Sequence, residues 1–326
     1  MNNPSRIIRW GIIGLGKIAH KFAEDISKVP NAALYAVASR DESKAKQFAK
    51  QYHAVKSYGS YLDLANDPQL DAVYIATPHV FHKEHSMLCL NQKKAVLCEK
   101  PFAMNSTEVN AMIETAQANN TLLMEAMWTC FLPHFQMVLN LLAEGAIGRI
   151  LSLEADFGFK PEYNPDSRVI NKELGGGSLL DIGIYPIFLA LTVLGIPNRI
   201  EASATFFDDG ADSSCQMTFD YGNNVKARLK SSFLEQTPTE ATIIGEKGRI
   251  RIHARFHSPT TFSLEKDGST KLFNPGIKSN GYNYEIEHFS NLLLQGKTES
   301  PIMTFERSRK LIRLLDAVRE RIGLDY

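Results

Sequence analysis

The chain has few cysteines, no excess of charge of either sign and no apolar N-terminal segment that resembles a signal peptide or a membrane span. Its 36 Lys and Arg residues balance 36 Asp and Glu residues, and no basic run stands out, which argues against nucleic acid and membrane surfaces as partners. The four cysteines, Cys89, Cys98, Cys130 and Cys215, include no C-x-x-C pair. These absences predict a protein of the reducing cytoplasm.

The apolar pattern changes once along the chain. Up to about residue 127, apolar strand segments alternate with helical segments, which is the rhythm of a doubly wound parallel sheet. After a helix near 132–144, longer strands with alternating polarity appear, and Gly222-Asn223 and the Gly245–Gly248 segment are typical of hairpin turns. A chain of 326 residues is also long for one compact core, so two domains are expected.

We therefore expect an α/β chain. Residues 1–127 should form a doubly wound parallel sheet domain, and residues 128–326 an α+β domain with a largely antiparallel open sheet. An amphipathic helix is expected near the end of the second domain, at about 304–322.

A glycine-rich turn follows the first predicted strand. The strand at Ile7–Ile13 leads into Gly14-Leu15-Gly16-Lys17-Ile18-Ala19, which matches the G-x-G-x-x-G/A dinucleotide fingerprint of Rossmann domains. Such glycines let a pyrophosphate approach bare amides at a helix N-terminus, here the start of a helix over 17–28. A tight turn without ligand would use the same glycines, but the strand before and the amphipathic segment after favour the cofactor site.

The end of the second predicted strand bears on the choice of cofactor. An NAD-selective site usually places Asp or Glu about 20 residues after the glycines, whereas this chain has Ser39-Arg40-Asp41. A hydroxyl and a guanidinium suit a 2′-phosphate, so NADP is favoured and NAD remains open. Alternatively, Ser39 and Glu42 form a capping box for a helix over 41–52, and Asp41 could still face a ribose.

Lys100 is the first candidate catalytic residue. It follows the apolar segment Ala95-Val96-Leu97 as part of Cys98-Glu99-Lys100-Pro101, where a charged pair needs partners or a function. Pro101 favours an extended Lys100, which directs the ammonium out of the strand end. Ligands of open parallel sheets bind at that edge.

A second group of candidates follows a glycine run at Gly175–Gly177. Asp181 and Tyr185 are four residues apart in an apolar helix, so they should share a face, and Pro186 should distort that helix. The pair could supply proton transfer to a hydride-transferring enzyme. The structural alternative is an Asp181 that caps a loop and a Tyr185 that serves as a core aromatic.

His79, His82 and His85 recur every three residues, which raises the question of a metal site. That spacing drifts around a helix and lacks an adjacent acidic or cysteine ligand, so no metal is expected.

Taken together, the G-x-G-x-x-A turn, the Glu99-Lys100-Pro101 motif and the Gly-Gly-Gly…Asp181-x-x-x-Tyr185 segment resemble the Gfo/Idh/MocA oxidoreductases over nearly the whole chain. Within that family, Trp128-Thr129 and the segment around Tyr185 are similar to the dimeric dihydrodiol dehydrogenases and NADP-dependent D-xylose dehydrogenases. Close relatives often carry arginine after the Trp-Thr pair, where this chain has Cys130.

The resemblance implies roles for several residues. Lys100 would contact the nicotinamide end of the cofactor and the reacting oxygen, and Tyr185 or Asp181 would relay the proton. The implied cofactor-binding residues are Gly14, Gly16, Lys17, Ile18, Ser39, Arg40, Thr77, Pro78, His82, Glu99 and Lys100.

Three further residues are candidates for substrate contact. Trp128 and Phe157 could form aromatic walls of a pocket, or could equally be core aromatics. Arg168 could bind an anion, although an exposed loop arginine is the commoner explanation.

These observations predict an NADP-dependent oxidoreductase that moves a hydride between its cofactor and a secondary alcohol or hemiacetal carbon of a sugar or diol. A homodimer through the sheet of the second domain is expected from the family. Two alternatives remain. One is an NAD-dependent glycosidase or epimerising enzyme that retains its cofactor, and the other is a non-catalytic dinucleotide sensor or scaffold.

Overall fold

The computed structural model describes residues 6–326, which divide into two compact units. The first unit contains the described residues up to Trp128 together with Lys278–Arg309, and the second contains Thr129–Ile277 and Lys310–Tyr326. A late segment of the chain therefore belongs to the first unit, outside the expected range of 1–127.

A parallel six-stranded sheet organises the first unit, in the order β3-β2-β1-β4-β5-β6. The strands are β1 (Ile8–Ile13), β2 (Ala32–Ala38), β3 (Lys56–Tyr58), β4 (Ala72–Ile75), β5 (Ala95–Glu99) and β6 (Leu123–Ala126). Every residue of β4, β5 and β6 is buried, as expected for a parallel sheet covered on both faces. This is the doubly wound order, so the predicted fold of the N-terminal part is confirmed.

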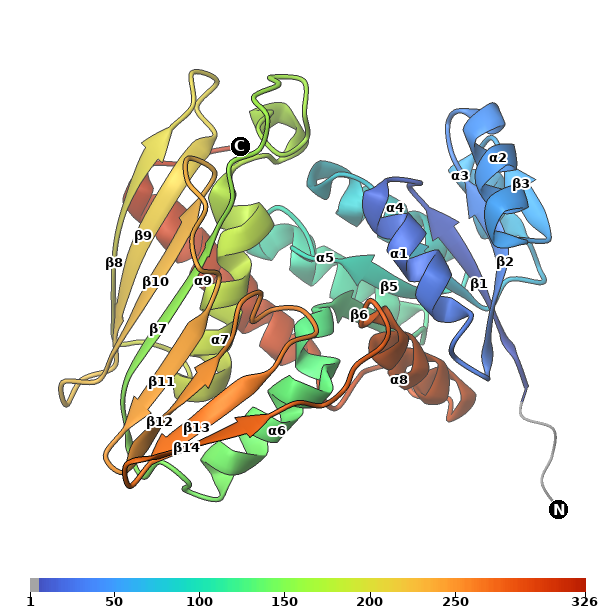
Figure 1. Cartoon of the computed structure of the whole chain (residues 1–326). Coiled ribbons are helices and arrows are strands. Elements are labelled where there is room, and N and C mark those ends of the chain that lie inside the picture. The colour runs from blue at the N-terminus through green and yellow to red at the C-terminus, as the bar shows by residue number, and fades with distance from the viewer. Residues whose placement is uncertain (1–5) are drawn as a thin grey trace, which may run out of the picture. The chain divides into compact units, whose positions relative to one another are not determined.

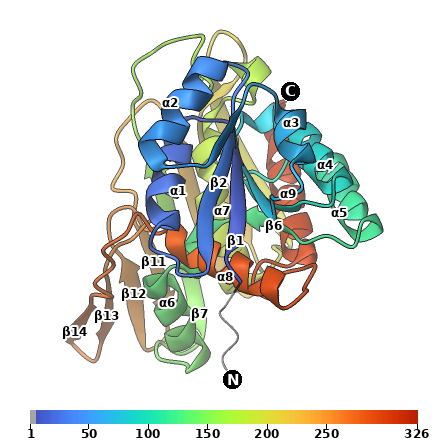
Figure 2. The ribbon, with the colours of Figure 1, turned by 90° about the vertical axis from the view of Figure 1, so that its right-hand side faces the viewer.

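Helices cover both faces of this sheet. They are α1 (Lys17–Ile26), α2 (Glu42–Tyr52), α3 (Tyr61–Asn66), the 3₁₀ turn η1 (His79–Phe81), α4 (His82–Asn91), α5 (Ser106–Ala118) and α8 (Tyr282–Leu294). The 3₁₀ turn η2 (Trp128–Phe131) begins at the last residue of the first segment of this unit and continues into the second unit. Figure 2 shows α1 and α2 on one side of β1 and β2, with α4 and α5 on the other. The amphipathic pattern predicted α1, α2 and α5 well, but not α3, α8 or the short β3.

Helix α8 packs against α1. The buried Asp25 of α1 accepts hydrogen bonds from the amides of Asn280, at 3.1 Å, and Tyr282, at 2.9 Å, and so caps the start of α8. Trp10 of β1 donates to Ser290 Oγ at 3.2 Å. These long-range bonds hold the late segment in the first unit.

The second unit is built on an eight-stranded sheet, in the order β14-β13-β12-β11-β7-β10-β9-β8 (Figure 1). Its strands are β7 (Ile150–Gly158), β8 (Arg199–Phe206), β9 (Asp212–Asp220), β10 (Lys226–Ser232), β11 (Ala241–Gly245), β12 (Gly248–Ile252), β13 (Phe262–Lys266) and β14 (Ser269–Phe273). Only β7 and β10 pair in parallel within the described sheet. The expected largely antiparallel sheet is thus confirmed, with both predicted hairpins.

The remaining helical elements are α6 (Pro133–Ala143), the 3₁₀ turn η3 (Lys172–Leu174), a π-helical turn η4 (Leu179–Gly183), α7 (Ile184–Leu194) and α9 (Phe305–Ile322). The contacts of α7 with β7 and β10 cover one face of the sheet, as Figure 1 shows. Residues Lys172–Leu194 are long and apolar enough to cross a membrane, but 83% of the apolar window is buried, which is typical of a core helix.

Candidate active site

The glycine turn of the first unit leaves a helix N-terminus open. A Cβ on Gly14, whose φ is +90°, would lie 2.7 Å from the backbone of Ala76 and Thr77, so only glycine fits there. A Cβ on Gly16 would meet nothing within 4 Å. Helix α1 has no side-chain cap and no acidic residue in its first turn. Its first amides, at Lys17 and Ile18, therefore form a cradle that fits a pyrophosphate.

The residues that follow β2 differ from the expected capping box. Asp41, not Ser39, caps α2 by accepting from the amide of Lys44 at 3.1 Å, and Ser39 Oγ accepts from the amide of Asp41. The Ser39–Glu42 interpretation was therefore wrong. One oxygen of the Asp41 carboxylate serves as the cap, and the exposed Arg40, which also interacts with the Tyr61 hydroxyl, places a positive charge at this strand end.

Histidines connect the ends of β4 and β5. The two ring nitrogens of the fully buried His82 lie 2.9 Å from the carbonyl oxygen of Thr77 and 2.8 Å from that of Pro101. A doubly protonated ring satisfies both carbonyls, whereas a neutral ring satisfies only one. His85 Nδ1 lies 3.1 Å from Thr77 Oγ1, and burial lowers the pKa of His85. His82 therefore links the segments after β4 and β5 through their backbone carbonyls.

Lys100 follows β5 directly, beside a buried carboxylate. Glu99 accepts from the Tyr74 hydroxyl and from the Lys100 amide, the latter at 3.1 Å. The Lys100–Pro101 peptide is cis. Lys100 thus lies at the carboxyl edge of the sheet, as expected, next to the strand end that carries Thr77 and Pro78.

Two buried acids near this edge were not predicted as site residues. Glu125 of β6 accepts from the amide of Phe102 at 3.2 Å, and burial raises the pKa of its carboxyl to about 7. Glu285 of α8 is fully buried, and burial together with the charge of Glu99 raises its pKa well above the usual range. An acid inside the apolar run of β6 was the available signal for Glu125. Nothing local marked Glu285.

Trp128 belongs to this first unit. Its ring stacks on Tyr282 with centroids 4.6 Å apart and an interplanar angle of 13°. It is 6% exposed, so most of the ring is held by this packing.

In the second unit the helix that carries Asp181 and Tyr185 starts with the π-helical turn η4 and continues as α7. We expected Pro186 to distort the helix, and the π-helical turn lies in the turn directly before it. Proline has no N–H to offer the carbonyl of Ile182, four residues earlier in the same helix, and its ring crowds that carbonyl, which accounts for the irregular turn there.

Asp181 pairs with another predicted residue. Arg168 Nη1 donates to Asp181 Oδ1 at 3.2 Å; the Arg168 side chain is 42% exposed and that of Asp181 is 9% exposed. Arg168 is therefore already engaged within the unit, as a partner of the candidate proton-transfer acid.

Tyr185 lies in an aromatic cluster. The Phe157 ring centroid is 5.9 Å from that of Tyr185 and 4.2 Å from that of His257, whose ring is 4.6 Å from Tyr185. The His257 carbonyl accepts from Thr129 Oγ1 at 2.7 Å. Cys130, next to Thr129, is fully buried. His257 was missed because it lies in a connection after β12, far in sequence from Tyr185.

The predicted residues thus form two groups. The first unit holds Lys100 and the candidate cofactor residues, and the second holds Asp181, Tyr185, Phe157 and Arg168. No cluster of three or more His, Cys, Asp or Glu residues suited to a metal occurs within residues 6–326.

Two family models match the chain. One, described as an oxidoreductase family with an NAD-binding Rossmann fold, covers residues 8–127, and the GFO/IDH/MocA C-terminal domain covers residues 135–251.

Curated relatives match over nearly the full length. Trans-1,2-dihydrobenzene-1,2-diol dehydrogenase of Xenopus tropicalis is 37% identical over 330 residues, covering 98% of this chain and 99% of that protein. The enzyme of the same name from Homo sapiens is 33% identical, with 98% of each chain covered.

Solved structures agree with these relatives. KijD10, a 3-ketoreductase from Actinomadura kijaniata crystallised with NADP and TDP-benzene, is 28% identical with a TM-score of 0.88, covering 97% of this chain and 98% of that chain. An aldose-aldose oxidoreductase from Caulobacter crescentus, at 24% identity, a TM-score of 0.89 and 98% coverage of both chains, shares the fold.

Proposed function

Because the chain belongs to the Gfo/Idh/MocA oxidoreductase family and is a dehydrogenase or reductase acting on CH–OH groups, we propose that it transfers a hydride between NADP and a secondary alcohol or hemiacetal carbon of a sugar or trans-diol. The full-length relatives named dihydrodiol dehydrogenases support a diol as the substrate. A ketoreductase crystallised with NADP supports both carbonyl reduction and NADP as the cofactor. A bound nicotinamide supplies the hydride chemistry.

The observation that carries the proposal is the open N-terminus of α1. The uncapped amides, the empty space above Gly16 and the steric requirement for glycine at residue 14 together make a cradle for a pyrophosphate. The exposed Arg40, with Ser39 beside it, supports recognition of a 2′-phosphate, because a guanidinium and a hydroxyl both donate hydrogen bonds to phosphate oxygens.

Lys100 would act on the reacting oxygen. Its position directly after β5 puts an ammonium at the edge of the sheet where the cofactor turn also lies, and a fixed cation stabilises an alkoxide that develops as hydride moves. The Glu99 carboxylate, by accepting from the Lys100 amide, fixes the backbone from which that side chain projects.

Tyr185 would transfer the proton. In reduction a phenol gives its proton to the alkoxide, and in oxidation the phenolate takes the proton of the alcohol. The Asp181 carboxylate, held by Arg168 and four residues earlier in the same helix, would supply a further proton acceptor. Phe157 and His257, packed against Tyr185, would limit the water around the phenol and offer an aromatic surface to the substrate. KijD10 structures include variants in which one lysine or one tyrosine was replaced.

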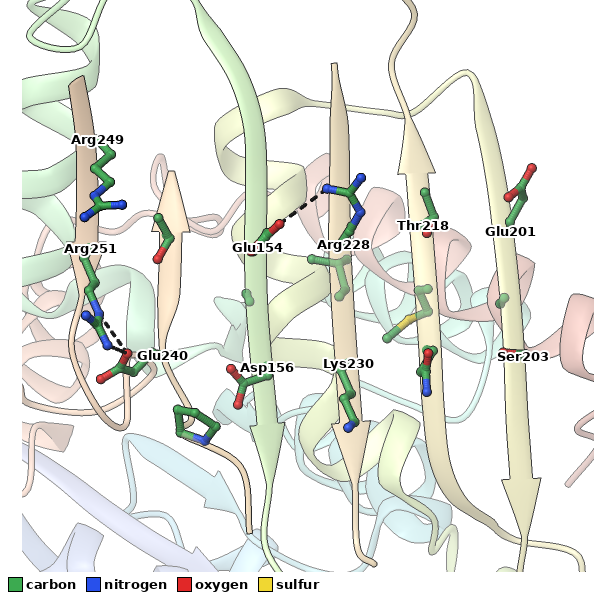
Figure 3. Close-up of a pocket in the computed structure, with 17 residues that line it drawn as sticks. Glu154, Asp156, Glu201, Ser203, Thr218, Arg228, Lys230, Glu240, Arg249 and Arg251 are labelled. Atoms are coloured by element: carbon green, nitrogen blue, oxygen red, sulfur yellow. Dashed lines mark hydrogen bonds and ion pairs between the residues drawn. The ribbon is translucent and has the colours of Figure 1, made fainter. Parts of the chain in front are cut away.

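A homodimer through the outer face of the eight-stranded sheet is part of the proposal, as is a cytoplasmic location. Figure 3 shows Glu154, Arg228, Thr218 and Glu201 on the same face of neighbouring strands, along a groove of about 750 Å³. Four bases, Arg228, Lys230, Arg249 and Arg251, and four acids, Glu154, Asp156, Glu201 and Glu240, line this groove. Equal numbers of both charges allow the face to complement a second copy of itself across a twofold axis.

The direct test follows absorbance of the reduced nicotinamide while NADP or NAD is offered with aldoses and trans-diols. Reduction of NADP by a diol or an aldose is the expected result. Silence across the panel, with cofactor released only on denaturation, would instead support an enzyme that borrows and returns its hydride. Silence without bound cofactor would support a non-catalytic protein.

A further inference from the structure

The start of the helix that carries Asp181 and Tyr185 is held by a residue from a distant strand. The turn η4 begins after Ser178, which forms no side-chain cap of its own. Instead Asp212, the first residue of β9, accepts at Oδ2 from the Leu179 amide at 2.8 Å and from the Ser178 hydroxyl at 2.6 Å. A carboxylate at a helix N-terminus satisfies amides that have no partner within the helix and interacts favourably with the helix dipole.

This cap lies in a dry environment. Asp212, Ser178 and Ser231 are each 0% exposed, and Ser178 Oγ lies 2.9 Å from Ser231 Oγ of β10. The other Asp212 oxygen, Oδ1, has no hydrogen-bond partner in the described chain. Burial raises the pKa of the Asp212 carboxyl to about 7, even though the bonds from Ser178 and Leu179 lower it. The start of the helix is therefore held to β9 by Asp212 Oδ2 and to β10 by the contact of Ser178 Oγ with Ser231 Oγ.

A second residue holds the glycine run that leads into the helix. Tyr326, after α9, donates its hydroxyl to the Gly176 carbonyl at 2.6 Å, and Arg319 lies 4.9 Å from its ring centroid. Gly177, at φ +115°, leaves no room for a Cβ, which would lie 3.0 Å from the Tyr326 hydroxyl and closer still to Asp212 Oδ1. The glycine run is thus enclosed by Asp212 and Tyr326.

We propose that Asp212 and Tyr326 are positioning residues for the reaction, because they fix the first turn of the helix from which Asp181 and Tyr185 act. The inference rests on the proposed function of Tyr185. Neither residue is needed for the chemistry itself. Rates depend steeply on the placement of a proton-transfer group, so loosening this turn lowers turnover more than it lowers cofactor binding, which belongs to the other unit.

The experiment compares Asp212→Asn, Asp212→Ala and Tyr326→Phe with the wild type. Tyr221→Phe is the matched control, because Tyr221 lies in the same unit and its buried hydroxyl has no partner among the described residues. Measurements are kcat, the KM for NADP, the melting temperature and amide hydrogen exchange over residues 170–186. We expect kcat to fall about tenfold to a hundredfold in Asp212→Ala and several-fold in Tyr326→Phe, with the KM for NADP unchanged and faster exchange over 170–186. Asp212→Asn, which keeps an acceptor oxygen, should retain more activity than Asp212→Ala.

A pH series separates positioning from general loss of stability. The ionised carboxylate is the better cap, so the ratio of wild-type kcat to that of Asp212→Asn should rise between pH 6 and 8. Among the described residues, Cys215 and Tyr326 are the titratable groups that interact electrostatically with Asp212. The pKa of Tyr326 is also affected by the charges of Asp181, Asp209 and Arg319. Tyr326→Phe removes one of the two groups that interact with Asp212 and should keep the same trend.

Unchanged kcat in Asp212→Asn and Tyr326→Phe would overturn the inference, and so would unchanged exchange over 170–186. A lower melting temperature combined with a ratio of wild-type kcat to Asp212→Asn kcat that stays constant across the pH series would also overturn it. The exchange measurement needs no substrate. A wild type that turns over no alcohol or aldose would count against the proposed function, and exchange would still decide whether Asp212 and Tyr326 hold the turn.

Discussion

Gly14 lies against the backbone of Thr77, at the point where β1 and β4 both end, and a Cβ at residue 14 would come within 2.7 Å of the Thr77 nitrogen. The cofactor turn and the strand end that carries Pro78 therefore fit together only if residue 14 is glycine. Two residues later, at Gly16, the space is open. The two glycines of the motif are thus required for different reasons: Gly14 for close packing of the backbone, and Gly16 for the open space above it.

This difference predicts that alanine at residue 14 affects stability, whereas alanine at residue 16 affects cofactor binding. Gly14→Ala should lower the free energy of unfolding by about 2 to 3 kcal/mol, through positive φ and backbone overlap. Gly16→Ala should leave the melting temperature of the cofactor-free protein unchanged but weaken NADP binding by about tenfold, because its methyl group occupies the pyrophosphate approach. Thermal unfolding and fluorescence titration with NADPH measure both effects. Equal NADPH affinity of Gly16→Ala and the wild type would contradict a cradle at this turn.

The choice between NADP and NAD should depend on Arg40. Arg40→Ala should raise the KM for NADP by about tenfold to a hundredfold, the loss of one charge-assisted hydrogen bond, with little change for NAD. Asp41→Asn is the control, since asparagine caps a helix as well as aspartate does. Steady-state kinetics with both cofactors decide the matter. An Arg40→Ala enzyme with an unaltered preference would remove the reason to assign the 2′-phosphate to this strand end.

Lys100 and Tyr185 should behave as parts of one reaction. Lys100→Met should lower kcat by about a thousandfold or more and Tyr185→Phe by about a hundredfold, the ranges typical of lost charge stabilisation and lost proton transfer. Because groups that act together are not additive, the double variant should lose much less than the product of the two effects. Lys50→Met, at an exposed position on α2, serves as the control. Full additivity would show that the two residues act independently.

Stability should depend on pH through Glu125. Its pKa is raised from 4.5 to about 7 in the folded chain, so the unfolded state loses its proton first as pH rises. The free energy of unfolding therefore decreases between about pH 4.5 and 7, by about 3 kcal/mol from this group, and is level above pH 7. Asp212, whose pKa is also raised to about 7, adds a change of the same sign.

Urea unfolding at pH 5 and pH 8 measures this decrease. Glu125→Gln, which keeps an acceptor for the Phe102 amide, should remove a large part of it. Glu144→Gln, at an exposed position after α6, should leave it intact. The same pH dependence in wild type and Glu125→Gln would show that Glu125 is ionised in the fold throughout this range.

The outer face of the eight-stranded sheet should hold two copies of the chain together. In each copy, Arg228 pairs with Glu154 and Arg251 pairs with Glu240. The double variant Arg228→Glu with Arg251→Glu replaces these two ion pairs by four negative charges. It should shift the protein from two chains to one in sedimentation equilibrium. Exchanging Arg228 and Glu154 with each other preserves the charge balance and should keep the larger species. A wild type that sediments as a single chain at micromolar concentration would rule out this interface.

Much of the fold could be predicted from local features. Apolar periodicity marked the strands β1, β2, β4 and β5 and the helices between them, because alternation of buried strands and amphipathic helices is a property of neighbouring residues. The glycine turn after β1 and the hairpins of the second unit followed from turn chemistry for the same reason.

The candidate site could be predicted only where its residues lie at strand ends or in a motif. Lys100, Gly14 and the pair Asp181 and Tyr185 were marked in this way. The contacts of His257 with Tyr185 and of Arg168 with Asp181 were not, since they join segments that no local pattern relates.

The sequence by itself therefore determined the fold class, the glycine turn at the start of α1 and the side chains that we propose for proton transfer. Only the tertiary structure decided that Asp25 caps α8 and brings residues 278–309 into the first unit, and that Asp212 caps the helix carrying Tyr185. The physical reason is that a helix N-terminus exposes amides that any buried carboxylate can satisfy, and the chain's folding alone selects which distant carboxylate does so.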